Sequence, residues 1–159
     1  MDINEFKRKY SNESDTKAVM EWAFEKIAAA PETYSFWLAE YNQPDLLTGP
    51  AWMQNNLVEG YFRNIEGLKK NCFASALVLT NDEGAQRISM VWLVPTQTVP
   101  KEFTSDDIAG SKIGDGFNLT QLKPAESEED KTTIINYMIW NEDKGAFGGY
   151  TYASGKIFK

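Results

Sequence analysis

Two apolar segments separated by a short polar turn place the strongest constraint on how this chain folds. The first runs from Phe73 to Thr80, and the second, from Arg87 to Val94, is again apolar, with alternation. Between them, Asn81-Asp82-Glu83-Gly84 has the residue types of a tight turn. Two β-type segments around a turn that contains glycine predict a β-hairpin. The chain is therefore expected to contain an antiparallel sheet.

Helices are predicted both before and after this hairpin in the sequence. Apolar residues recur at spacings of three and four over residues 3–10, 15–29 and 51–69, and the first two segments follow Asp2 and Ser14, which can cap them. In the third, the expected buried stripe is Met53, Leu57, Tyr61, Ile65 and Leu68, with Trp52, Val58 and Phe62 beside it. Ser127 and the acids at 128–130 predict the start of a fourth helix, which ends near Trp140.

Two more strands are predicted, over residues 34–42 and 117–122. The first has Tyr34 and Phe36 on one face and Trp37 and Tyr41 on the other, so it is expected to carry aromatic rings on both faces. The segment 95–116 is the least regular part of the chain. Helices interspersed with hairpin-linked strands favour an α+β fold over a doubly wound one. A length of 159 residues fits one domain.

The residue types needed for several kinds of catalysis are missing. The sequence has no histidine and one cysteine, Cys72. This excludes a Ser-His-Asp triad, a Cys-His pair and an internal disulfide, and it makes a zinc site improbable. Gly114-Asp115-Gly116 is too short to cradle a phosphate, so we expect a turn there and no cofactor. Cys72 opens an apolar segment and is interpreted as an inert buried thiol, and Glu40 as an exposed strand residue.

Negative charge predominates and is spread evenly along the chain. There are 16 basic and 23 acidic residues, a net charge of −7. Such a chain is not expected to bind nucleic acid directly. The two small basic segments, Lys7-Arg8-Lys9 and Lys69-Lys70, are interpreted as solvated helix faces. No signal peptide and no membrane-spanning segment is evident, so we expect a cytoplasmic protein.

Several strings resemble one known family. Residues 5–13 (Glu-Phe-Lys-Arg-Lys-Tyr-Ser-Asn-Glu), 55–62 (Asn-Asn-Leu-Val-Glu-Gly-Tyr-Phe) and 70–75 (Lys-Asn-Cys-Phe-Ala-Ser) are similar to the C-terminal domain of the gamma subunit of eukaryotic translation elongation factor 1B. The closing 155–159 (Gly-Lys-Ile-Phe-Lys) looks like that family's extreme C-terminus. The similarity departs after Trp92, where Val94-Pro95-Thr96-Gln97 replaces the family's Arg-Gly-Gln turn.

The resemblance implies an antiparallel sheet of about five strands, partly wrapped by helices, as a flat concave domain over residues 1–159. The family's upstream transferase-like domain and charged linker are not part of this sequence. The implied function is that of a non-catalytic scaffold within the elongation factor 1B guanine nucleotide exchange complex. Its partners are then other elongation factor 1B subunits and the elongation factor 1A complex.

The hypothetical contact residues are polar side chains in and just after the matched central string. They are Asn55, Asn56, Arg63, Lys70 and Asn71. The alternative for the asparagines is capping and turn formation around a core helix, which we favour. For the whole chain the alternative is a small-molecule-binding domain, or an enzymatic domain that uses carboxylates and lysine. A deep apolar pocket and a carboxylate of raised pKa would favour that alternative.

Overall fold

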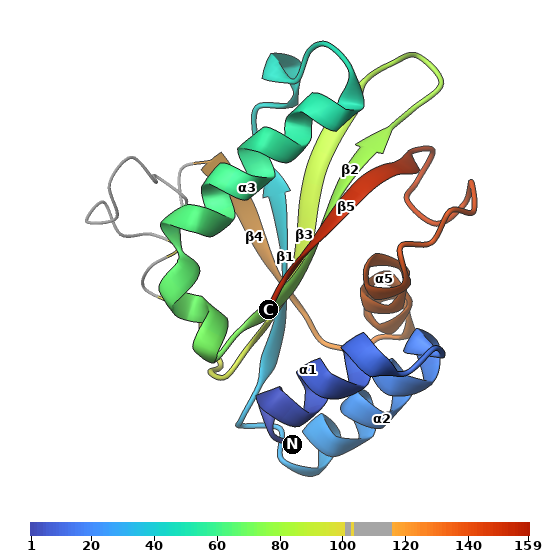
Figure 1. Ribbon diagram of the computed structural model, residues 1–159. Coiled ribbons are helices and arrows are strands. Elements are labelled where there is room, and N and C mark those ends of the chain that lie inside the picture. The colour runs from blue at the N-terminus through green and yellow to red at the C-terminus, as the bar shows by residue number, and fades with distance from the viewer. Residues whose placement is uncertain (101–102, 104–115) are drawn as a thin grey trace.

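Five antiparallel strands form one open sheet in the computed structural model, which describes residues 1–100, 103 and 116–159 (Figure 1). The strand order across the sheet is β4-β1-β3-β2-β5. The strands are β1 (Ser35–Tyr41), β2 (Phe73–Thr80), β3 (Gln86–Val94), β4 (Phe117–Leu122) and β5 (Thr151–Phe158). The α+β class is confirmed. Most of the segment 95–116, including the Asp115 turn, lies outside the described residues.

The predicted hairpin is confirmed and forms the middle of the sheet. β2 and β3 pair from Phe73 opposite Leu93 to Thr80 opposite Gln86. In the turn, the Asn81 side chain accepts hydrogen bonds from the backbone N–H groups of Glu83 and Ala85. Because helices cover both faces of these two strands, they are apolar along almost their whole length rather than strictly alternating.

One face of the sheet is covered by α1 (Ile3–Asn12), α2 (Thr16–Ala29) and α5 (Glu128–Ile139), as Figure 1 shows. Asp2 and Ser127 cap α1 and α5 as predicted, since their side chains accept from the N–H groups of Asn4 and Asp130. The predicted cap of α2 is wrong. Asp15, not Ser14, accepts from the N–H of Ala18, which places the cap one residue later.

The other face is covered by α3 (Asn55–Asn64), which lies between two 3₁₀ turns, η2 (Ala51–Gln54) and η3 (Glu66–Lys70). The prediction of one continuous helix over 51–69 is therefore wrong. The backbone leaves the helical conformation at Ile65, whose φ of −118° lets its side chain turn into the core. The expected stripe is shifted as well. Tyr61 and Ile65 of that stripe are buried as predicted, but Met53 and Trp52 are exposed, and Val58 and Phe62 beside the stripe are buried as well.

Strand β5 was not predicted from the sequence. It is an edge strand, and all but one of its residues are half-buried or exposed, so it lacks a strong apolar signal. Its pairing with β2 changes register where Val78 faces Ser154 and Leu79 faces Tyr152, which leaves Ala153 as a bulged residue. A bulge of this kind interrupts the two-residue alternation by which a strand is identified.

Two aromatic clusters fill the core, one on each side of the sheet. Under α3, the indole of Trp92 is surrounded by the rings of Phe62, Phe103 and Phe158 at 4.8–6.0 Å between centroids. On the opposite side, Phe6 meets Phe73 edge to face. Strand β1 contributes aromatic rings to both clusters, as predicted. Within the described part of the chain, no helix has the length and apolar character needed to cross a bilayer.

Candidate functional site

A groove of about 520 Å³ separates α3 from the edge strand β5. Its lining combines two apolar residues, Phe62 and Ile157, with charged side chains from α3, η3 and β5. The lining residues are Glu59, Phe62, Arg63, Glu66, Lys69, Lys156 and Ile157. Both α3 and η3 contribute, because the chain turns at Ile65 instead of continuing as one helix.

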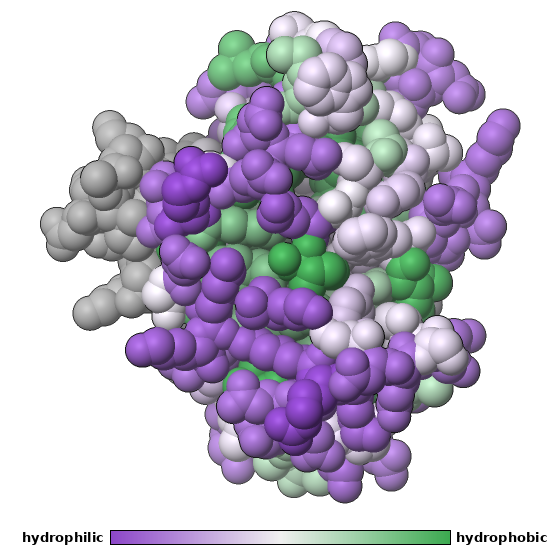
Figure 2. Space-filling view, viewed as in Figure 1, coloured by the Kyte–Doolittle hydropathy of each residue, from purple (hydrophilic) through white to green (hydrophobic). Residues whose placement is uncertain are grey.

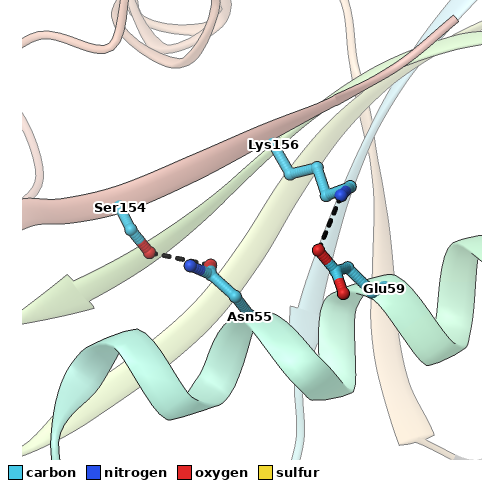
Figure 3. A network of polar contacts seen from close by, with 4 residues as sticks. All are labelled: Asn55, Glu59, Ser154 and Lys156. Carbon is cyan, nitrogen blue, oxygen red and sulfur yellow. Dashed lines mark hydrogen bonds and ion pairs between the residues drawn. The ribbon is translucent and has the colours of Figure 1, made fainter.

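Two polar contacts join α3 to β5 across this groove (Figure 3). The hydroxyl of Ser154 donates to Asn55 Oδ1 at 2.8 Å, and Lys156 Nζ donates to Glu59 Oε1 at 2.8 Å. Asn55 and Glu59 lie one helical turn apart, and Ser154 and Lys156 lie two residues apart on one face of the strand. The two spacings match, so both pairs form at once and fix α3 along the strand.

The contact between Lys156 and Glu59 also affects the charge state of Glu59. The hydrogen bond and the positive charge of Lys156 lower the pKa of Glu59, and Arg63 adds a smaller effect in the same direction. Glu59 is therefore held as a carboxylate. Proton transfer by a general acid requires the opposite shift, so this carboxylate is suited to binding rather than to acid catalysis.

The two basic segments of the sequence meet at one end of this groove. Lys7 Nζ, from α1, donates to the backbone carbonyl of Lys69 in η3. Burial lowers the pKa of Lys7, and interaction with the thiol of Cys72 acts against that shift. The Lys69 ammonium lies 5.7 Å from the ring centroid of Phe158. The interpretation of the two segments as separate solvated faces is therefore wrong for Lys7, which is half-buried against η3.

Strand β5 and the residue that follows it add two more cations to this region. Lys156 lines the groove, and Lys159 Nζ donates to the hydroxyl of Ser11, one helical turn beyond Lys7. Hydrophilic side chains crowd the area between α3 and α1 in the space-filling view (Figure 2). We call this region the basic surface. It is defined by Lys7, Arg63, Lys69, Lys70, Lys156 and Lys159, with the carboxylates Glu59 and Glu66 among them.

The five contact residues predicted from the sequence have different places in this arrangement. Arg63 lines the groove, and Lys70 and Asn71 are exposed at the end of η3. Asn55 is half-buried in its bond to Ser154, so its position is structural, although its side chain bridges to β5 rather than capping α3. Asn56 is exposed and points about 100° away from Asn55 around the helix.

Sequence reasoning missed the partners that come from distant segments. Lys156 and Ser154 belong to a strand that was not predicted, Lys159 directly follows it, and Lys7 precedes Lys69 by 62 positions. The only sequence feature that points to the basic surface is the basic character of residues 7–9 and 69–70, and it does not reveal that the two segments are neighbours.

The two residues considered in the sequence for reactive chemistry, Cys72 and Glu40, are both packed into the fold. Cys72 is buried, as predicted. Glu40 is half-buried rather than exposed, because β1 is an inner strand and places it opposite Ser89 of β3. Among the residues that the structure describes, no group of three or more Cys, Asp or Glu side chains is arranged to hold a metal ion.

Comparisons with known proteins give one consistent result. The family model "Elongation factor 1 gamma, conserved domain" matches residues 1–98. A probable elongation factor 1-gamma of Caenorhabditis elegans is 32% identical over 99% of this chain and 37% of its own length. The elongation factor 1-gamma of Homo sapiens is 33% identical over 99% and 34%, and that of Schizosaccharomyces pombe is 30% identical over 99% and 36%. The chain thus spans about a third of the length of the curated relatives it matches.

Proposed function

The chain belongs to the family of the elongation factor 1 gamma conserved domain, and from this premise we propose that it is a protein-interaction domain of the translation elongation factor 1B complex. We place it as one domain, residues 1–159, in the C-terminal part of a longer, cytoplasmic gamma subunit. Its proposed role is to hold partners, namely other subunits and the elongation factor 1A complex, and not to catalyse nucleotide exchange.

The basic surface is the feature of the structure that supports this proposal with named residues. In a chain with a net charge of −7, Lys7, Lys69 and Lys156 converge from α1, η3 and β5 around one groove. Lys156 pairs with Glu59 at 2.8 Å and Lys69 with Glu66 at 3.7 Å, so the excess positive charge of this surface comes from Lys7 and from the exposed Arg63 and Lys70. A surface whose sign is opposite to that of the protein attracts ligands that the rest of the protein repels. We propose that it binds an acidic segment of a protein partner.

An acidic peptide fits this surface better than RNA. Glu59 and Glu66 lie among the cations and would repel a continuous polyphosphate backbone. Individual carboxylates of a peptide can instead reach the exposed Arg63 and Lys70 without contacting either glutamate. Asn56 and Asn71 remain proposed polar contacts at the rim, and Asn55 is proposed to position α3.

Membership of the complex is tested by purifying the full-length protein from its own cells under native conditions and identifying what accompanies it. We expect subunits of the exchange factor. Their absence from a preparation in which the protein itself is intact would refute the translation function.

The surface is tested with the double variant Arg63→Glu and Lys70→Glu in the same full-length protein. The matched control is Lys17→Glu and Lys144→Glu, which makes the same change in net charge at two other exposed lysines. We expect the first variant to lose a partner that the control retains, with both unfolding at the wild-type temperature. Equal recovery of the partner by both variants would show that the basic surface is not its binding site. Loss of the partner on ribonuclease treatment would show that RNA is the ligand.

A further inference from the structure

A second concave site lies on the opposite side of the sheet. It is a cleft of about 970 Å³ between α2, the loop before β1 and the segment that joins β4 to α5. We call it the α2 cleft. Its volume falls within the range of sites that enclose a small ligand or a few peptide side chains. None of the five predicted contact residues lies in it.

The floor of the α2 cleft is apolar and continuous. Phe36 of β1 and Leu122 of β4 are paired in register, so their side chains lie next to each other. The ring of Phe24 meets that of Phe36 edge to face at 5.7 Å between centroids. Trp22 and Tyr34 are half-buried at the walls, where each presents part of its ring to the cleft. Such a floor favours an aromatic or large aliphatic side chain.

One wall of the cleft is held in place by hydrogen bonds of its own. The side-chain amide of Gln97 donates to the backbone carbonyls of Pro31 and Tyr34, both at 3.0 Å. The hydroxyl of Ser35 donates to the carbonyl of Thr96. These bonds fix the loop between α2 and β1 without any ligand, so the cleft is formed before binding and little ordering is required.

The rim of the cleft is predominantly acidic. Glu21 and Glu25 lie one turn apart on α2, and Glu126 and Glu128 lie across the cleft near the start of α5. Two lysines also line it. Lys131 is neutralised by Glu21 at 3.2 Å, while Lys123 is exposed. The remaining carboxylates therefore exceed the remaining cation, and the rim attracts positive charge.

We propose that the α2 cleft docks a short peptide segment of a partner protein in which a large apolar side chain is flanked by lysine or arginine. The apolar side chain contacts the half-buried rings of Trp22 and Tyr34, above a floor formed by the buried Phe24, Phe36 and Leu122. The flanking cations contact Glu25 on one rim and Glu126 on the other. This partner segment differs in charge from the acidic one proposed for the basic surface, so either proposal can fail without the other.

The test uses the 159-residue chain labelled with ¹⁵N and a probe peptide of sequence Lys-Lys-Leu-Phe-Leu-Lys-Lys with blocked ends. We expect amide shifts confined to α2, the residues from 121 to 128 and the loop before β1. We expect no saturable binding when the three apolar residues are replaced by serine, or when the lysines are replaced by glutamate. Binding of the serine peptide with equal affinity, or shifts spread over the whole acidic surface, would overturn the proposal.

Charge reversal on the rim locates the binding. Glu25→Lys and Glu126→Lys should each weaken the Lys-Lys-Leu-Phe-Leu-Lys-Lys peptide about fivefold, as expected when one exposed attraction becomes a repulsion. Glu83→Lys, in the turn between β2 and β3, makes the same charge change away from the cleft and should leave the affinity unchanged. An equal loss in all three variants would overturn the site. The same shifts with monomeric dodecylphosphocholine, and none with the peptide, would show a lipid site instead.

Discussion

Replacing Gly155 with alanine should destabilise the protein, although glycine is a poor residue for a strand. Gly155 lies in β5 opposite Leu77, and the indole of Trp140 packs directly on its backbone. A Cβ at this position would lie 2.8 Å from Trp140 Cε2 and 3.1 Å from Leu77 Cδ2. Carbon atoms pack at about 3.5–4.0 Å, so the methyl group does not fit unless the indole moves.

The indole is held by several contacts at once. Trp140 Nε1 donates to Ser75 Oγ at 2.9 Å, and the ring stacks on Tyr152 at 5.6 Å between centroids. Its backbone ends α5 in the left-handed conformation with φ of 54°. Forcing an extra methyl into such a site costs about 1–3 kcal/mol. Alanine in place of glycine in a strand gains about 0.5–1 kcal/mol. The balance is a loss of about 0–2.5 kcal/mol, which lowers Tm by up to about 10 °C for a domain of this size.

Chemical and thermal unfolding of four variants checks the reasoning: Gly155→Ala, Gly60→Ala, Trp140→Leu, and Trp140→Leu combined with Gly155→Ala. Gly60→Ala is the matched control, because Gly60 lies in α3 and its Cβ would meet nothing within 4 Å. It should stabilise the protein by about 0.5–1 kcal/mol. In a Trp140→Leu background the two closest contacts are removed and only Leu77 Cδ2 remains at 3.1 Å, so adding Gly155→Ala should cost less than it does in the wild type. Stabilisation by Gly155→Ala in the wild type, or the same cost in both backgrounds, would refute the steric argument.

Three further predictions test other features of the fold. Asp15→Ala should cost about 1 kcal/mol in urea unfolding because it removes the cap of α2, whereas Ser14→Ala should stay within about 0.5 kcal/mol. Burial raises the pKa of Tyr137 to about 12. The stabilisation that comes from this shift is complete below about pH 10 and is lost as the pH rises towards about 12. Tyr137→Phe should therefore flatten the alkaline fall in the free energy of unfolding by up to about 1.4 kcal/mol per pH unit. Because Lys156 lowers the pKa of Glu59, wild type and Glu59→Gln should differ in urea midpoint at pH 7 and converge as the pH falls below 4.5.

The elements that were predicted correctly carry their signals locally. The hairpin of β2 and β3, strand β4 and helix α5 each contain their own turn, cap or apolar pattern, so tertiary context adds nothing to their identification. The segment 51–69 has a helical pattern too. It breaks at Ile65 because burial of that side chain against the sheet outweighs one more turn of helix.

The candidate site could be predicted only in part, because most of it is assembled from distant segments. Arg63 and Lys70 lie in a string that resembles the family, and both are at the basic surface. Lys156 belongs to a bulged edge strand with little apolar alternation, and Lys159 directly follows that strand. The approach of Lys7 to Lys69 depends on the packing of α1 against β2 through Phe6 and Phe73, which no local pattern encodes.

The two proposed binding sites lie on opposite faces of one sheet and prefer opposite charges. Three cations and two carboxylates line the groove beside α3, whereas four carboxylates and two lysines line the α2 cleft, so the two sites have net charges of opposite sign. A single partner segment therefore cannot satisfy both, because the charge that favours one site opposes the other. Neither site covers the other, since the sheet separates α2 from α3. Under the two proposals, partners of opposite charge bind at the same time, which is what the proposed scaffold function requires.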